Sequence, residues 1–274
     1  MNHFTSQRFA PIMALLSGLK SIILCLIMLG SLNSMAQNTT SNADIVDLSE
    51  RTLYAVKAES DYGKMLDSLA GLRIRDLTVQ LNDQSKRMVF WINIYNAFYQ
   101  ILHRDQGIKP PKVFKVNWIN IAGKQLSLDD IEHGFLRKHR YKYSLGYFPQ
   151  FFTARWKKDL EVQTLDYRVN FALNCGAKSC PPIAFYTPAD LDDQLNRAAA
   201  SFLETETVID ESSKTISVTR IMFWFLGDFG GKAGIRLVLE KHLQIDANGY
   251  KIQFRDYDWS EDLMNFSDET QSSY

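Results

Sequence analysis

The sequence has no net charge, few cysteines and no internal repeat, and each shortage argues against a class of protein. Thirty-one lysines and arginines balance thirty-one aspartates and glutamates. No overall field therefore draws the chain to nucleic acid or to anionic lipid, and only local patches could do so. The three cysteines leave no second pair for a zinc site of the usual kind.

What the sequence does have is the composition of a globular protein. Hydrophobic residues make up 46% of the chain and charged residues 23%, which excludes disordered, collagen-like and low-complexity architectures. A chain of 274 residues buries roughly 70–75% of its unfolded surface when it folds. It therefore needs no metal or disulfide framework in order to fold.

Residues 1–36 lack acidic side chains and carry the features of a secretory signal peptide in the usual order. Two basic residues come first, an apolar run follows at residues 22–29, and Ser34 and Ala36 are the small residues at the −3 and −1 positions of a cleavage site. The segment is therefore predicted to be a signal peptide that is removed after Ala36.

An uncleaved anchor is the alternative interpretation of the same segment. Residues 12–32 are long enough to cross a bilayer, which requires about 20 residues. Both interpretations export the rest of the chain, to the periplasm or the extracellular space, and neither predicts membrane contact outside this segment. Residues 37–44 are polar and are expected to form a flexible leader.

The strongest local pattern lies at residues 85–104, where large apolar side chains recur at spacings of three and four. This spacing predicts a largely buried helix. Four polar side chains on that helix fall within about 80° of one another, and we call them the polar seam: Asn93, Asn96, Gln100 and His103. Buried amides require hydrogen-bond partners, so the polar seam is expected to face other polar groups.

Helix and strand patterns mix along the rest of the chain without a regular alternation. Helices are predicted at 45–69, in two segments broken near Gly63, and at 127–139, 187–203, 221–226 and 232–243. Strands are predicted at 113–121, 169–173 and 250–254, and a hairpin at 208–209 and 215–219. The expected fold class is α+β: a single compact domain at 45–265, with a small mixed or antiparallel sheet packed against several helices, and a polar tail at 266–274.

The segment 174–182 (NCGAKSCPP) concentrates reactive side chains at the end of a predicted strand. Cys175 is a candidate nucleophile, because a thiolate with a lowered pKa attacks carbonyl groups, and the backbone N–H groups of Gly176 and Ala177 could hold an oxyanion. One alternative is a structural disulfide between Cys175 and Cys180, formed in an oxidising compartment. Another is a zinc site, for which only scattered histidines could supply the missing ligands.

A nucleophilic cysteine needs a base. His133 is the candidate, beside Glu132 on a short helix that opens with a capping box; alternatively, His133 lies outside the apolar stripe of that helix and is solvated. Asn93 or Asn96 is a candidate to orient a partner or to bind the oxyanion. Asp258 is a candidate to orient a histidine, as the acid of a triad does.

Four motifs occur in the order of a known family: residues 90–97 (FWINIYNA), 127–134 (SLDDIEHG), 171–182 (FALNCGAKSCPP) and 257–260 (YDWS). On these motifs the chain resembles the domain of unknown function 547 family over residues 85–260. The resemblance implies one α+β domain of the kind found in exported bacterial proteins, and in plant proteins that add a coiled-coil segment this chain lacks. It implies no activity.

Two hypotheses of function follow from these residues. In the first, the protein is an exported thiol hydrolase or acyltransferase: Cys175 attacks the carbonyl of an amide or ester, and His133 takes and returns the proton. In the second, it is a non-catalytic binding domain of the cell envelope with a Cys175–Cys180 disulfide. In both, the ligand is an unidentified small molecule or peptide, nucleic acid is not an expected partner, and no cofactor or metal is predicted.

Overall fold

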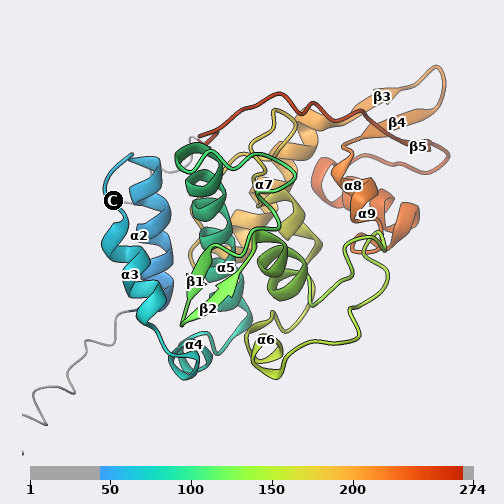
Figure 1. The fold of residues 1–274 in the computed structure, drawn as a ribbon. Helices are drawn as coiled ribbons and strands as arrows, with labels where there is room; N and C mark the ends of the chain where they lie inside the picture. The colour runs from blue at the N-terminus through green and yellow to red at the C-terminus, as the bar shows by residue number, and fades with distance from the viewer. Residues whose placement is uncertain (1–43, 268–274) are drawn as a thin grey trace, which may run out of the picture. The chain divides into compact units, whose positions relative to one another are not determined.

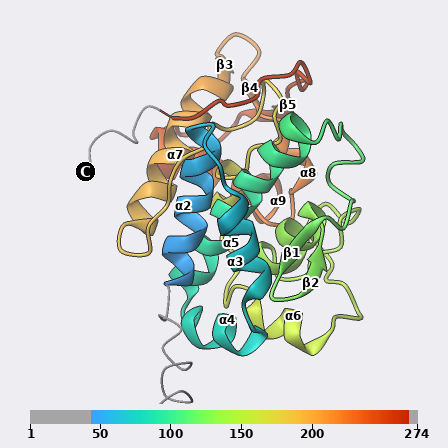
Figure 2. The same cartoon turned by 60° about the vertical axis from the view of Figure 1, so that its left-hand side comes forward.

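One helix, α5 (Gln84–Gln100), lies at the centre of the fold. Every residue from 88 to 100 is buried, and a helix that is buried all round needs neighbours on all sides. Two helices, α2 (Ile45–Lys57) and α3 (Gly63–Gly71), lie beside it in both views (Figures 1 and 2). The helix predicted at 85–104 is therefore confirmed.

The structure, a computed structural model, describes residues 44–267. The predicted signal peptide at 1–36, together with most of the predicted leader and most of the predicted tail, lies outside these residues. Within residues 44–267 no helix is both long enough and apolar enough to span a membrane.

The other elements follow in chain order. The helices and helical turns are α4 (Ile74–Gln80), η1 (Ile101–Asp105), η2 (Asp130–Leu136), α6 (Arg155–Leu160), η3 (Tyr167–Phe171), α7 (Leu191–Glu206), α8 (Ile221–Trp224) and α9 (Gly231–Leu243). The strands are β1 (Ile119–Ile121), β2 (Lys124–Leu126), β3 (Val208–Asp210), β4 (Thr215–Val218) and β5 (Lys251–Phe254).

A three-stranded sheet packs with α7 and α9 in a second hydrophobic cluster, apart from the cluster around α5. β3 and β4 form the predicted antiparallel hairpin, with Ile209 opposite Ile216. β5 adds to β4 in parallel, with Ile216 opposite Ile252 (Figure 1). A separate antiparallel pair joins β1 and β2. The described residues therefore form an α+β fold with small sheets, as the sequence predicts.

The strand predicted at 169–173 is wrong. A turn of 3₁₀-helix, η3, occupies this position, and Asn96 bonds the chain that follows, donating to the carbonyl of Ala172 and accepting from the backbone N–H of Asn174, both at 2.9 Å. A short buried apolar run has no period that separates a strand from a helical turn. Here a side chain supplies the partners that a neighbouring strand would have supplied.

Two other predicted elements differ in extent or type. Of the strand predicted at 113–121 only β1 is extended, because the chain before it forms turns. The helix predicted at 127–139 is the π-helical turn η2. The predicted capping box is present at its start, where Ser127 and Asp130 each accept from the other's backbone N–H at 3.1 Å.

Both ends of the described chain are tied to the fold more closely than predicted. Asp44, expected in the leader, caps α2. Phe266, expected in the tail, stacks on Phe185 with 6.0 Å between ring centroids, and the backbone N–H of Ser267 donates to Ile183. Capping, apolar packing and backbone hydrogen bonds thus hold residues that were predicted to be flexible because the sequence around them is polar.

A buried ion pair joins the segment after η2 to the turn between α8 and α9. Arg137 Nε lies 2.5 Å from Asp228 Oδ2, Nη2 lies 3.1 Å from Oδ1, and neither side chain exceeds 1% exposure. The guanidinium also stacks 4.1 Å from the centroid of the Phe225 ring. Gly146 lies against this pair with φ of 84°, and a Cβ there would overlap the Asp228 carboxylate.

We expect Asp228→Asn to lower the free energy of unfolding by about 3–5 kcal/mol, because the variant leaves the Arg137 charge buried and unpaired. Urea unfolding at neutral pH measures the change. The matched control is Asp256→Asn, which removes an exposed carboxylate 3.4 Å from Arg220 and should change stability by less than about 1 kcal/mol. A similar small change in both variants would contradict a structural role for the buried pair.

Candidate functional site

A pocket of about 530 Å³ lies where η2, the loop after it, the 170–180 segment, α8 and the C-terminal segment meet. Its polar lining residues are Asp129, Glu132, His133, Lys142 and Asn170. Its aromatic lining residues are Tyr95, Phe114, Tyr143, Trp224, Phe225, Tyr257 and Trp259. Cys175, Cys180 and three aliphatic side chains complete the wall. Most of these residues are far apart in the sequence, so the pocket exists only in the folded chain.

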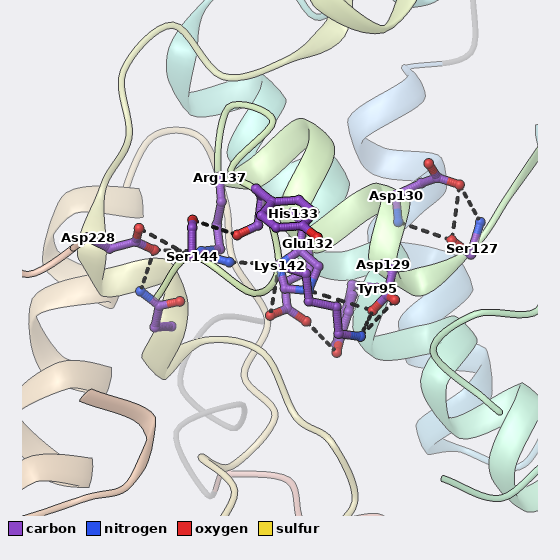
Figure 3. Close-up of polar contacts among 12 residues, drawn as sticks. Tyr95, Ser127, Asp129, Asp130, Glu132, His133, Arg137, Lys142, Ser144 and Asp228 are labelled. Carbon is purple, nitrogen blue, oxygen red and sulfur yellow. Dashed lines mark hydrogen bonds and ion pairs between the residues drawn. The ribbon is translucent and has the colours of Figure 1, made fainter. Parts of the chain in front are cut away.

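Two carboxylates on one side of the pocket have different partners (Figure 3). Lys142 Nζ lies 2.7 Å from both carboxylate oxygens of Asp129. Glu132 instead accepts from the Tyr95 hydroxyl at 3.1 Å, and burial raises the pKa of Glu132 above its usual range. π-Helical turns often occur at functional sites, and η2 and the residue before it present both acids to one cavity.

His133 is buried and neutral. Its Nδ1 lies 2.7 Å from Arg137 Nη1, and because a guanidinium only donates, Nδ1 accepts and the ring proton is on Nε2. That Nε2 lies 3.6 Å from Asp129 Oδ1. Burial and the Arg137 charge lower the pKa of His133 to about 3. Figure 3 shows the imidazole between the Arg137–Asp228 pair on one side and Lys142 with Asp129 on the other.

The two cysteines of the 174–182 segment form a disulfide that lines the pocket. The Tyr257 hydroxyl lies 3.0 Å from both sulfur atoms. In this state Cys175 has no thiolate. The turn around it depends on Gly176, which has φ of 68° and whose added Cβ would lie 2.6 Å from a ring carbon of Tyr99. A side chain at position 176 would therefore displace the disulfide loop.

Three aromatic rings form the wall next to the disulfide. The centroid of Tyr257 lies 4.7 Å from that of Trp224 and 4.6 Å from that of Trp259, and the two tryptophans are 5.6 Å apart. We call these residues the aromatic trio. Such a surface, in the same pocket as Glu132 and the Asp129–Lys142 pair, can hold a ligand that is apolar at one end and polar at the other.

Comparison with known proteins identifies the region that carries most of this site. Residues 79–203 match the model of the family described as "Protein of unknown function, DUF547". This part of the chain therefore corresponds to a DUF547 domain. No curated protein and no solved structure gave a significant match. The predicted resemblance is therefore confirmed, and the aromatic trio lies C-terminal to the matched residues of the DUF547 domain.

The structure brings three of the five predicted site residues to the pocket and keeps two away from it. Glu132, His133 and Cys175 line it. Asn93 and Asn96 are fully buried within the DUF547 domain, where Asn96 holds the chain before the disulfide, and the Asn93 amide lies 3.5 Å from both the Ser49 hydroxyl and the Tyr186 carbonyl. Their amides serve backbone positioning in this structure.

Two lesser expectations about the acid and base are wrong. His133 is not solvated but 5% exposed, because the turn after η2 folds back and Arg137 covers the ring. Asp258 does not orient a histidine here: it is exposed, and it accepts from the backbone N–H of Ser260 within its own turn.

The polar seam does face polar groups, as expected, and those groups include backbone atoms and a carboxylate of two loops. Besides the Asn96 bonds, Gln100 Oε1 accepts from the backbone N–H of Met264 at 3.3 Å, and His103 Nε2 lies 3.1 Å from the carboxylate of Glu261. The seam therefore anchors the two chain segments that carry the disulfide and Tyr257.

Sequence reasoning missed Arg137, Lys142 and the tryptophans. A local signal was present for Arg137, because Asp129, His133 and Arg137 are spaced four residues apart and such residues share a helix face. No local signal marks Lys142 or Trp224 as pocket residues. Within residues 44–267 no group of three or more histidine, cysteine or acidic side chains is placed to hold a metal ion.

The neutral state of His133 predicts a stability change with pH. Between about pH 6.5 and 3 the unfolded chain binds a proton at this histidine and the folded chain does not, so the free energy of unfolding falls as the pH is lowered, by at most about 1.4 kcal/mol per pH unit. His133→Gln, whose amide can still accept from Arg137, should flatten this slope. Urea titrations at pH 7, 6 and 5 on both proteins measure the difference.

Other buried groups also change the free energy of unfolding with pH, but they leave the expected difference in slope between wild type and His133→Gln. The pKa of His139 is lowered to about 4 by burial and by Lys157, which acts in the same direction in both proteins. The raised pKa of Glu132 acts oppositely, since its contribution to stability falls as the pH rises through the raised value. Equal slopes for wild type and His133→Gln would show that the imidazole is protonated in the folded state.

Proposed function

We propose that this DUF547 protein is a binding domain of the cell envelope, and that its ligand is a small molecule or short peptide with an apolar or aromatic body and a hydrogen-bonding group. The observation that carries the proposal is the pocket itself, which is lined by the aromatic trio together with Glu132 and the Asp129–Lys142 pair. A site of this size and mixed lining is typical of small-molecule recognition.

The states of the sulfur and the imidazole support binding over catalysis. A disulfide sulfur cannot act as a thiolate nucleophile, and Cys175 is bonded to Cys180. A general base must be free to accept a proton, whereas His133 Nδ1 is occupied by Arg137 and its pKa is lowered to about 3. A disulfide is also compatible with export, because oxidising compartments preserve it.

Ligand screening tests the proposal. Native mass spectrometry of the protein with aromatic amino acids, short peptides and amphipathic small molecules should detect a one-to-one complex. Trp259→Ala should raise the dissociation constant of that ligand about tenfold or more, since truncating an aromatic anchor that the ligand buries commonly costs over 1 kcal/mol. Leu237→Ala, an exposed apolar residue of α9, is the control and should bind as wild type. Equal affinity in all three proteins would place the ligand elsewhere.

A second candidate function is the thiol hydrolase or acyltransferase, and the observation that favours it is that Cys175, Glu132 and His133 line one pocket. After an external dithiol has reduced the disulfide and has itself become oxidised, Cys175 would lose its proton and attack an amide or ester carbonyl, expelling the amine or alcohol; water or a second acceptor would then release the acyl group. Glu132 is the better proton acceptor of the two neighbours, because its raised pKa lies nearer to neutrality.

The oxidation state of the cysteines separates the two functions. Differential alkylation of protein prepared without reductant, read by peptide mass spectrometry, should find the 175–180 peptide fully disulfide-bonded. The Cys175→Ser/Cys180→Ser double variant should keep ligand binding and lose about 2 kcal/mol of stability or less, because the closed loop is short. A free Cys175 that alkylates faster than Cys180, with loss of an amidase or esterase activity in Cys175→Ser, would favour the enzyme.

A further inference from the structure

The segment from Tyr141 to Phe152 places an unusual number of aromatic side chains in solvent. Within residues 44–267, six of the large exposed hydrophobic residues belong to this stretch of twelve: Tyr141, Tyr143, Tyr147, Phe148, Phe151 and Phe152. Phe151 is 86% exposed and Phe152 is 98% exposed. Single exposed apolar residues are ordinary on a protein surface, but a contiguous group marks a surface that contacts something else.

Backbone bonds hold this segment to the domain. The N–H of Gln150 donates to the carbonyl of His139 at 2.6 Å, and the N–H of Gly227 donates to the carbonyl of Leu145 at 2.7 Å. In Figure 1 it is part of the yellow-green chain that passes α8 and α9 and continues to α6. Because its backbone is fixed at these points, the fold presents the exposed rings at a defined place.

The charged side chains of the sequence around these rings have a single sign. Residues 133–158 contain no aspartate or glutamate, although the whole chain has no net charge. Seven basic residues lie in that span: Arg137, Lys138, Arg140, Lys142, Arg155, Lys157 and Lys158. Arg137, Lys142 and Lys157 pair with acids from other segments, while Arg155 and Lys158, three and six residues after Phe152, are exposed.

We propose that residues 141–158 dock the protein on a bilayer that carries anionic head groups. Phe148, Phe151 and Phe152 enter the boundary between head groups and acyl chains, where amphipathic and aromatic side chains are favoured. Arg155 and Lys158 contact the lipid phosphates. Aromatic residues flanked by basic residues suit an anionic bilayer, because each basic side chain adds electrostatic attraction to the lipid head groups.

This docking is a membrane contact in addition to the one that the N-terminal segment would make if it is not cleaved. It stands apart from the proposed ligand binding, because the side chains proposed to contact lipid, Phe148, Phe151, Phe152, Arg155 and Lys158, do not line the pocket. The two surfaces are nevertheless adjacent, since Tyr143 and Leu145 of the same segment line the pocket. Docking would bring the pocket close to the lipid surface.

Vesicle flotation with the full chain tests the proposal. The probe is large unilamellar vesicles of equal parts phosphatidylglycerol and phosphatidylcholine, compared with vesicles of phosphatidylcholine alone. Phe151→Ser/Phe152→Ser and Arg155→Gln/Lys158→Gln should each reduce binding to the anionic vesicles about tenfold. Raising the salt from about 0.1 to 0.5 M should weaken wild-type binding, because the Debye length shortens. The N-terminal segment is the same in all variants, so it cannot produce these differences.

The control is Val79→Ser/Leu237→Ser, which removes two exposed apolar side chains from other elements and should bind vesicles as wild type. Unchanged thermal unfolding of the aromatic variant would show that it is folded. Equal vesicle binding by wild type and the aromatic variant overturns the proposal, as does concentration-dependent self-association of wild type alone, which would make the surface a protein interface. Trp259→Ala should bind vesicles as wild type does. A failure of the ligand screen would therefore count against the proposed ligand binding, and a failure of vesicle binding would count against the proposed docking.

Discussion

The buried pair of Arg137 and Asp228 is the interaction on which the site depends. A carboxylate and a guanidinium removed from water are tolerated only when each satisfies the other. Here the pair also ties the chain after η2 to the turn between α8 and α9. The same guanidinium donates to His133 and stacks on Phe225. One charged group thus adds to burial in keeping the imidazole neutral and contacts an aromatic wall residue.

The pocket combines parts of two hydrophobic clusters. The cluster around α5 contributes the carboxylates on η2 and the disulfide loop, and the cluster around the sheet contributes Trp224, Phe225 and Tyr257. The matched DUF547 region ends at residue 203, before these aromatic residues. A ligand that contacts both faces would therefore bind the family's own residues together with those of the C-terminal region.

The buried amide side chains of the polar seam have a structural role, which is to hold two loops in place. Asn96 and Gln100 satisfy backbone groups of two loops that have no strand partner at those points. Buried polar groups of this kind are costly unless bonded, and when bonded they specify one arrangement of the chain. The disulfide and the Tyr257 hydroxyl meet at 3.0 Å because both segments are anchored to the same helix.

Local pattern in the sequence determined the buried helix at 85–104, the capping box at Ser127, the hairpin of β3 and β4 and the α+β class, since periodicity and capping act over a few residues. It also singled out Glu132, His133 and Cys175, which share one pocket. The tertiary structure decided that 169–173 is a helical turn, that His133 is covered by Arg137, and that distant tryptophans line the pocket. The helical turn and the pocket wall depend on contacts between residues dozens of positions apart, which no local pattern encodes. Arg137 is only four residues from His133, but its side chain is held by Asp228, 91 positions away.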